Sequence, residues 1–231
     1  MPALLPSLWI LTLFLAIAAW IYRRVSFSKA GGFRNRRQIT GCEFVRQILD
    51  DHRFNRVAVK PMAVARTAHF HSRLGELHLP ERIYYGTQLL DLAMGMHGAM
   101  HLLQESKALV PVELQIQGSR LFRMMVLASW FLIGGGMIFS RFESWVPIGQ
   151  LLFIFTFLLA LASLAEEWEV TSRSLASLSK LEEFEPNERM HLKRLLRAIQ
   201  WTPLAELFGS PFTLFARTTE KVKGHAVSKF S

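Results

Sequence analysis

Two histidines four residues apart, His97 and His101, are the residues of this chain best suited by type and spacing to do chemistry. They lie in residues 86–105, an apolar stretch rich in Leu, Met and Ala and without proline, which predicts a helix. Residues four apart share one face of a helix, so both imidazoles could bind the same metal ion. Such a pair is also typical of histidines that only make structural hydrogen bonds, and the spacing alone favours that interpretation.

A metal site needs a third ligand, because a catalytic zinc ion takes three protein ligands and keeps one position open. The best candidate is Glu167, which follows a long apolar run directly. Its neighbours Glu166 and Glu169 suggest the alternative that all three glutamates form a solvated helix end. On these residues alone, the alternative is favoured.

The residue after the first histidine decides what a metal site could do. On a His-Glu-x-x-His helix, the Glu is the general base of a metalloprotease. This chain has Gly98 there, which has no side chain to carry a proton. Helical geometry offers no replacement: Asp91 lies off the face of His97, Glu105 lies one turn beyond His101, and Glu166 should point away. A metal bound here would lack its base.

Composition indicates a membrane protein. Hydrophobic residues make up 51% of the chain, and Lys and Arg outnumber Asp and Glu by 27 to 18. In so apolar a chain, the basic excess favours membrane lipids over nucleic acid as the partner. No zinc-finger, helix-turn-helix or RNP-like motif supports nucleic-acid binding. The single Cys42 excludes an intramolecular disulfide and fits a reducing compartment.

Three apolar runs are long enough to span a bilayer: residues 3–22, 121–139 and 146–165. The first run resembles a signal peptide, but no basic residue precedes it, so we expect an uncleaved anchor. The other two form a hairpin around Arg141. Lys and Arg gather between the first two runs and after the third, which places these parts in the cytoplasm and the N-terminus outside. We therefore expect an integral protein of the plasma (inner) membrane.

The polar segments predict a few regular elements. Thr40 and Glu43 form a capping box that starts a helix, which ends near Asp50 and Asp51. Residues 57–59 and 74–79 predict short strands. We read residues 195–215, which carry two prolines and two charged residues, Arg197 and Glu206, as a membrane-surface or re-entrant segment.

The predicted fold is mainly α, with about three transmembrane helices and a mostly helical domain with short strands. The expected parts are an anchor (1–22), a basic linker at the membrane surface (23–39), a domain with the histidine helix (40–120), a transmembrane hairpin (121–165) and a helical C-terminal region (166–231).

Four segments, in order, resemble the neutral zinc metallopeptidases, a family of membrane-bound bacterial proteins with a zincin-like His-Glu-x-x-His helix. The likeness covers most of residues 1–180. Its segments are Thr40–Asp50, His69–His71 with Leu77–Glu81 and Tyr84, Met96–Gln104 with the later Pro111, and Glu167–Leu175.

The resemblance implies that His97, His101 and Glu167 are zinc-ligand positions and that zinc is the cofactor. It also implies a missing general base at Gly98, with Met100 crowding the site. We expect a pseudopeptidase that still binds zinc and a peptide or protein partner at the cytoplasmic face. The alternatives are an active zinc peptidase whose base comes from elsewhere, through Glu105 or His69, and a metal-free membrane scaffold. An extended partner would pair with residues 74–79 as an edge strand, at Leu74, Glu76, Leu77 and His78.

Overall fold

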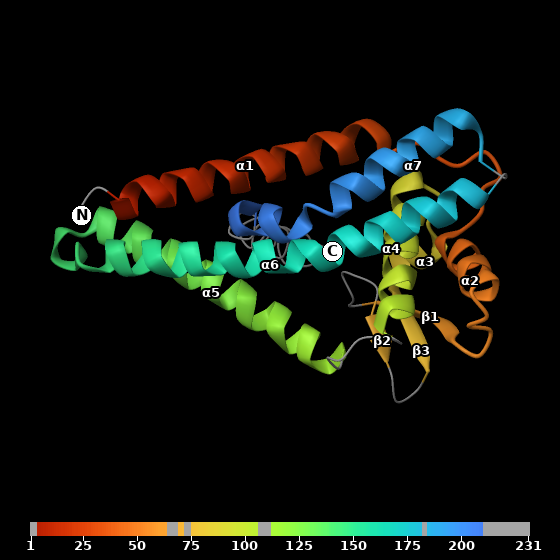
Figure 1. The fold of residues 1–231 in the computed structure, drawn as a ribbon, viewed down its shortest axis with the longest axis horizontal. Coiled ribbons are helices and arrows are strands. Elements are labelled where there is room, and N and C mark those ends of the chain that lie inside the picture. The colour runs from red at the N-terminus through yellow and green to blue at the C-terminus, as the bar shows by residue number, and fades with distance from the viewer. Residues whose placement is uncertain (1–3, 64–68, 72–74, 106–111, 182–183, 210–231) are drawn as a thin grey trace, which may run out of the picture. The chain divides into compact units, whose positions relative to one another are not determined.

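The computed structural model describes residues 4–63, 69–71, 75–105, 112–181 and 184–209 (Figure 1). The chain folds into two compact units. Unit 1 comprises Met1–Ile21, Gln117–Ser163 and Thr202–Ser231. Unit 2 comprises Tyr22–Ile116 and Leu164–Trp201. Unit 2 therefore joins most of residues 40–120 with the first part of 166–231, two regions that the sequence suggested as separate.

Unit 1 is built from long apolar helices. Its helices are most of α1 (Leu4–Ala30) and α5 (Val112–Ile138), the first part of α6 (Trp145–Lys180), and a short helix at 202–209, with the 3₁₀ turn η1 (Ser140–Phe142) in the hairpin. Helices α1 and α6 and residues Leu121–Ile138 of α5 are long and apolar enough to cross a membrane. The three predicted spans are confirmed as helices of sufficient length and apolarity. Large apolar side chains such as Phe14, Phe131 and Leu158 are exposed on them, as expected for surfaces that face lipid.

The helix at 202–209 packs inside unit 1. The indole Nε1 of Trp130 donates to the carbonyl oxygen of Leu207 at 2.9 Å, and Arg123 lies 3.6 Å from Glu206. The preceding helix α7 (Pro186–Ile199) instead buries Leu195 and Leu196 in the core of unit 2. The stretch 195–215 is therefore not one segment, because a turn at 200–201 divides its apolar residues between two cores. Residues 210–215 lie outside the described residues, and the placement of this stretch at the membrane stays a prediction.

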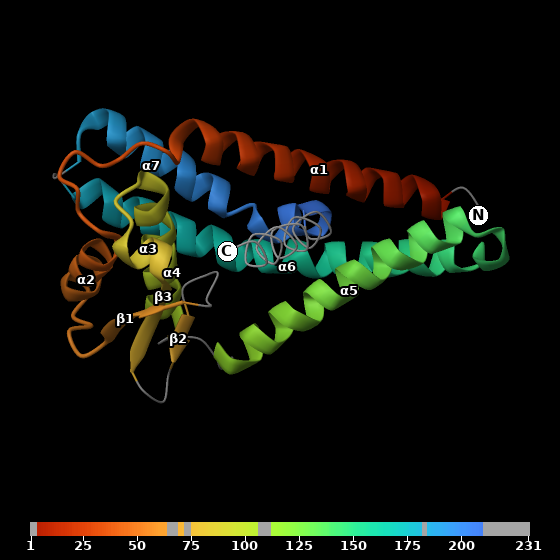
Figure 2. The ribbon, with the colours of Figure 1, turned by 180° about the vertical axis from the view of Figure 1, so that it is seen from behind.

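Unit 2 surrounds helix α4 (Leu89–Glu105) with short elements (Figures 1 and 2). These are α2 (Gly41–Asp51), a three-stranded sheet, α3 (Glu81–Tyr85), the last part of α6, and α7. Their apolar side chains form one hydrophobic core that includes Phe44, Ile48, Leu92, Met96 and Leu192. The core therefore fixes α4 from several sides.

The sheet has the strand order β1-β3-β2, formed by β1 (Ala58–Met62), β2 (His69–His71) and β3 (Glu76–Pro80). Strand β1 is parallel to β3, whereas β2 is antiparallel to it. The two predicted strands are confirmed within a few residues, and β2 was not predicted. The expectation that β3 is an edge strand is wrong: both its edges carry partners, so β1 and β2 are the edges.

Glycines let α2 approach α4 and α3 closely. The predicted capping box at Thr40 and Glu43 is present and begins α2. A Cβ atom on Gly95 of α4 would lie 2.9 Å from Val45 of α2, and one on Gly41 would lie 2.0 Å from the Ile83 carbonyl oxygen. Gly95 costs helix propensity but permits this contact, so the packing explains a residue that otherwise weakens α4.

The segment before α2 is anchored to the start of α4. Helix α1 continues to Ala30, so the irregular part is shorter than the linker predicted for 23–39. The side chain of Asn35 is buried, donates to the carbonyl oxygens of Ile39 (2.8 Å) and Thr87 (2.7 Å), and accepts from the Ile39 amide. Arg36 also contacts Glu185 and Glu188 near α7.

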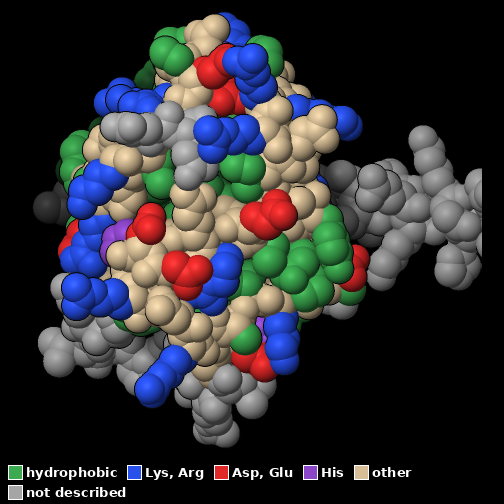
Figure 3. Space-filling model, turned by 90° about the vertical axis from the view of Figure 1, so that its right-hand side faces the viewer, with side chains coloured by type: hydrophobic (Ala, Val, Ile, Leu, Met, Phe, Trp, Pro, Cys, Tyr) green, Lys and Arg blue, Asp and Glu red, His purple; other side chains and the backbone are tan. Residues whose placement is uncertain are grey.

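The face in Figure 3 shows Lys and Arg side chains interspersed with Asp and Glu.

Replacing the buried amide should loosen this anchor. In an Asn35→Ala variant, the two carbonyl oxygens and the Ile39 amide lose their partner, which should lower the free energy of unfolding by about 2 kcal/mol. For a chain of this size, the melting temperature in detergent should fall by about 4–8 °C. The exposed Asn187→Ala on α7 is the control and should melt like the wild type. Equal melting temperatures for both variants would contradict the anchoring role.

Candidate metal centre

Helix α4 presents its two histidines beside a buried face. Leu92, Met96, Ala99 and Leu103 of α4 lie in the core of unit 2. The His97 and His101 side chains remain 12% and 29% exposed. The imidazoles therefore lie at the margin of the core, where they are shielded from water without being sealed off.

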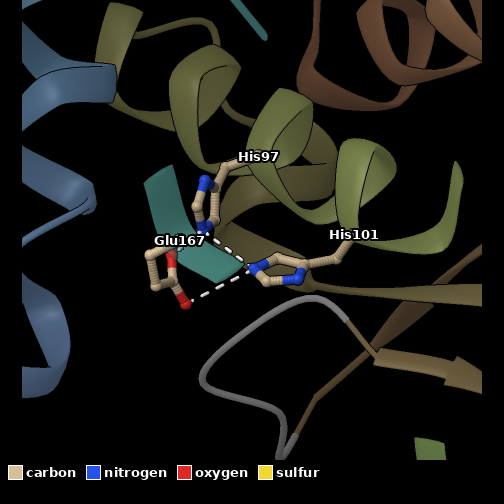
Figure 4. Close-up of side chains that lie close together, drawn as sticks. All are labelled: His97, His101 and Glu167. Atoms are coloured by element: carbon tan, nitrogen blue, oxygen red, sulfur yellow. Dashed lines mark hydrogen bonds and ion pairs between the residues drawn. The ribbon is translucent and has the colours of Figure 1, made fainter. Parts of the chain in front are cut away.

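The third predicted ligand meets the histidines in the structure (Figure 4). Glu167 of α6 has a side chain only 19% exposed, and its Oε2 lies 3.0 Å from His97 Nε2. Its Oε1 lies 3.5 Å from His101 Nε2, and the two Nε2 atoms are 3.1 Å apart. Within the described part of the chain, these are the residues whose His, Cys, Asp or Glu donor atoms converge as a group of three or more.

These separations fit a zinc ion. Zinc binds nitrogen and oxygen donors at about 2.0–2.1 Å, so two donors at tetrahedral positions lie about 3.3 Å apart. The separations are 3.0 Å from Glu167 Oε2 to His97, 3.5 Å from Glu167 Oε1 to His101 and 3.1 Å between the two imidazoles, and they bracket that value. The donor chemistry also fits, because two imidazoles and one carboxylate form a common catalytic zinc set. The three side chains could hold zinc with little movement.

A second contact joins the same two helices. Gln104 of α4 donates to Glu169 Oε2 of α6 at 3.0 Å. Glu169 is also paired with Arg173, one turn further along α6. This exposed network is worth little energy by itself. It does tie the last turn of α4 to α6 at the residues flanking Glu167, which helps to position the carboxylate.

Burial and the neighbouring carboxylate shift the pKa of His97 in opposite directions. Burial lowers the pKa of its imidazole below the ordinary value, and the neighbouring Glu167 carboxylate partly offsets this effect. The neutral form of histidine is the one that binds a metal. The surroundings therefore favour the ligand form of His97.

No described carboxylate replaces the missing base. Gly98 occupies the position after the first histidine, Glu166 is exposed, and Asp91 is buried near Arg82 at the other end of α4. The side chains of Glu105 and His69, considered as substitute bases, lie outside the described part. Met100, expected to crowd the site, is buried in the core of unit 2.

Three of the four residues predicted to bind an extended partner, Glu76, Leu77 and His78, lie on β3. Leu77 is buried in the core and cannot contact a partner from outside. Glu76 and His78 contact each other at 2.8 Å, and Leu74 lies outside the described residues. As β3 is the central strand, a partner strand could pair only with β1 or β2.

Apolar helices long enough to cross a membrane, together with a His/His/Glu donor set on two helices, define a membrane-associated protein of the zinc-peptidase class. A comparison with protein families agrees: the sequence model of a family described as "putative neutral zinc metallopeptidase" matches residues 6–218. The chain belongs to this family. No curated protein and no solved structure matches the chain.

The lowered pKa of His97 predicts how the metal-free protein responds to pH. With metal removed by a chelator, the unfolded chain takes up a proton on His97 more readily than the folded protein. Stability should be full above the ordinary imidazole pKa of about 6.5 and should fall as the pH drops through the window below it.

Chemical denaturation at a series of pH values measures this effect. In a His97→Gln variant, the loss of stability at low pH should be smaller. A His52→Gln variant, which changes an exposed histidine after α2, should lose stability at low pH as the wild type does. If the free energy of unfolding changed with pH in the same way for wild type and His97→Gln, burial of His97 would not disfavour its protonated form, and the prediction would be wrong.

Proposed function

We propose that this chain is a zinc-binding pseudopeptidase: it holds zinc at His97, His101 and Glu167 but does not hydrolyse peptide bonds. The observation that carries the proposal is the pairing of a complete, converging ligand set with Gly98 at the general-base position. Family membership supports zinc as the metal.

The ligands and the base have different tasks, so one can be lost without the other. When bound, zinc would polarise a substrate carbonyl and increase the acidity of water. His97, His101 and Glu167 would hold the ion, with the partly buried carboxylate offsetting its charge. Peptide hydrolysis further needs a group that takes a proton from the attacking water and delivers it to the leaving amine. Such a group contributes about 10²–10⁴-fold, and glycine cannot supply it.

We propose that the role of the protein is to bind rather than cleave. The partner would be a peptide or protein segment at the cytoplasmic face, where basic residues around the spans favour placement of unit 2. In this topology the N-terminus and Arg141 lie on the outer side of the inner membrane. The spanning helices contact the membrane lipids. An edge strand of the sheet, β1 or β2, would pair with an extended partner.

Metal analysis tests the first half of the proposal. The protein purified in detergent should lose about one equivalent of zinc in a His97→Ala/His101→Ala variant, because one remaining carboxylate cannot hold the ion. The His52→Gln variant is the control and should keep the full content. Equal zinc content in the wild type and the double variant would contradict the metal site and favour the metal-free scaffold.

Restoring the base tests the second half. Wild-type protein should cleave a mixed peptide library no faster than the His97→Ala/His101→Ala variant. A Gly98→Glu variant should gain about 10²–10⁴-fold over that background, because the missing proton carrier is replaced.

Two controls make the gain specific. Gly98→Gln has the same size but no carboxylate and should stay inactive, and Gly98→Glu combined with His97→Ala should lose the gain. Cleavage by the wild type that disappears with His97→Ala/His101→Ala would instead establish an active peptidase with a substitute base. Absence of any gain in a zinc-loaded Gly98→Glu protein would mean that more than the base is missing.

A further inference from the structure

Helix α7 has an apolar face and a basic face. Its apolar side chains, which include Leu192 and Leu196, are buried in the core of unit 2. Three basic side chains of α7 are exposed: Lys193, Arg194 and Arg197. A spacing of four residues places Arg189, Lys193 and Arg197 along one side of the helix. This side forms a basic surface that the core of unit 2 does not cover.

Helix α7 supplies no acid that neutralises this surface. Its one acidic residue, Glu188, is in the first turn. The Glu188 carboxylate accepts from the backbone amides of Arg36 at 2.7 Å and Glu185 at 3.1 Å. Among the described residues, neither Lys193 nor Arg197 has an ion-pair partner. The positive charge of the basic surface is therefore available to an anionic partner.

The basic surface borders a hollow of about 510 Å³ at the start of α7. Its lining is apolar and basic, without an acidic residue: Phe184, Pro186, Arg189, Met190 and Lys193. Met190 remains 50% exposed, so an apolar side chain lies open beside the two cations. A lining of this kind suits a ligand that has both a negative group and an apolar part.

Arg189 is the residue of the hollow best placed to bind an anion. One guanidinium nitrogen, Nη2, donates to the carbonyl oxygen of Leu181 at 2.8 Å, which fixes the side chain. Its Nε is buried and has no hydrogen-bond partner among the described residues. A buried donor without an acceptor is costly, and a phosphate oxygen would supply the acceptor. The planar fork of N–H groups on arginine matches a phosphate group.

The position of α7 in the chain favours a lipid as the source of that phosphate. Residues 200–201 join α7 to the helix at 202–209 of unit 1, the unit that holds the candidate membrane spans. The basic surface therefore comes within a few residues of a membrane-spanning unit. Basic residues next to membrane spans attract the headgroups of anionic lipids.

We propose that Arg189 and Lys193 bind the headgroup phosphate of an anionic phospholipid, with Arg197 extending the basic surface along α7. The exposed apolar part of the hollow, at Met190, would contact the start of an acyl chain. Helix α7 would thus lie at the membrane surface, with one face in the core of unit 2 and the other on lipid. This site does not depend on zinc or on the role proposed for the His97 site.

The test uses the full chain in a neutral detergent, with bound lipid counted by native mass spectrometry during titration. The wild type should bind phosphatidylglycerol about tenfold or more tighter than phosphatidylcholine, whose headgroup has no net charge. Arg189→Gln/Lys193→Gln should weaken phosphatidylglycerol binding by about 30-fold, since each cation near an anionic lipid contributes about fivefold. Equal affinity of the wild type for both lipids, or of wild type and variant for phosphatidylglycerol, would overturn the site.

A matched variant controls for net charge. Arg53→Gln/Arg56→Gln removes two positive charges from exposed residues after α2 and should bind phosphatidylglycerol as the wild type does. Arg189→Gln also removes the hydrogen bond to Leu181. If that variant unfolds, Lys193→Gln/Arg197→Gln, which changes exposed residues only, should weaken binding to the same degree, and unchanged binding would overturn the proposal. Zinc content should be the same in all these variants.

Two competitors identify the occupant of the hollow. Inorganic phosphate has the charge of the headgroup without the apolar part, and a glutamate-rich peptide has charge without phosphate. Neither should displace phosphatidylglycerol at equal concentration. Displacement by inorganic phosphate would assign the hollow to a free anion, and displacement by the peptide would assign it to an acidic protein segment. Either result would overturn the lipid site.

Discussion

The contact of His97 and His101 on α4 with Glu167 on α6 is the interaction on which the rest of unit 2 depends. Three polar side chains held within 3.5 Å of one another and largely shielded from water are costly unless they pair or share a cation. The two helices must therefore be held in fixed register. The core of unit 2 does this by enclosing α4 between α2, α3, the sheet and α7, with glycines at the closest approaches.

The site separates two properties that zinc peptidases combine. Ligands fix an ion through distance and donor type, which is a geometric requirement that three side chains from two helices can meet. Catalysis adds a proton carrier at one particular position of the same helix. Gly98 removes the carrier while leaving α4 continuous and its histidines in place. Under the proposed function, this family member keeps the metal-binding architecture without the reaction and uses it for binding.

The sheet shows how topology changes the meaning of a sequence pattern. Residues 76–80 alternate polar and apolar as an edge strand would, but β1 and β2 occupy both edges of β3. The alternation instead separates a buried row, Leu77 and Leu79, from an outer row, Glu76 and His78. The outer row lies opposite the histidines of β2, a strand with too few residues to produce a sequence signal of its own.

The sequence by itself determined the features that depend on local chemistry. Apolar length specified three spans, Thr40 and Glu43 specified where α2 begins, and the spacing of His97 and His101 specified one face of α4. The lack of a general base was equally evident from the sequence, because Gly98 has no side chain in any structure. Glu167 was the best third-ligand candidate among the residues, but only the family resemblance favoured that role over a solvated helix end.

Only the tertiary structure decided the features that depend on long-range contacts. It brought Glu167 to the histidines, placed β3 between two strands, and assigned residues 186–199 to unit 2 and 202–209 to unit 1. Helix periodicity and capping involve neighbours within one or two turns, so they are encoded locally. Strand order and contacts between distant helices arise from the best burial of apolar surface by the whole chain, which no single segment encodes.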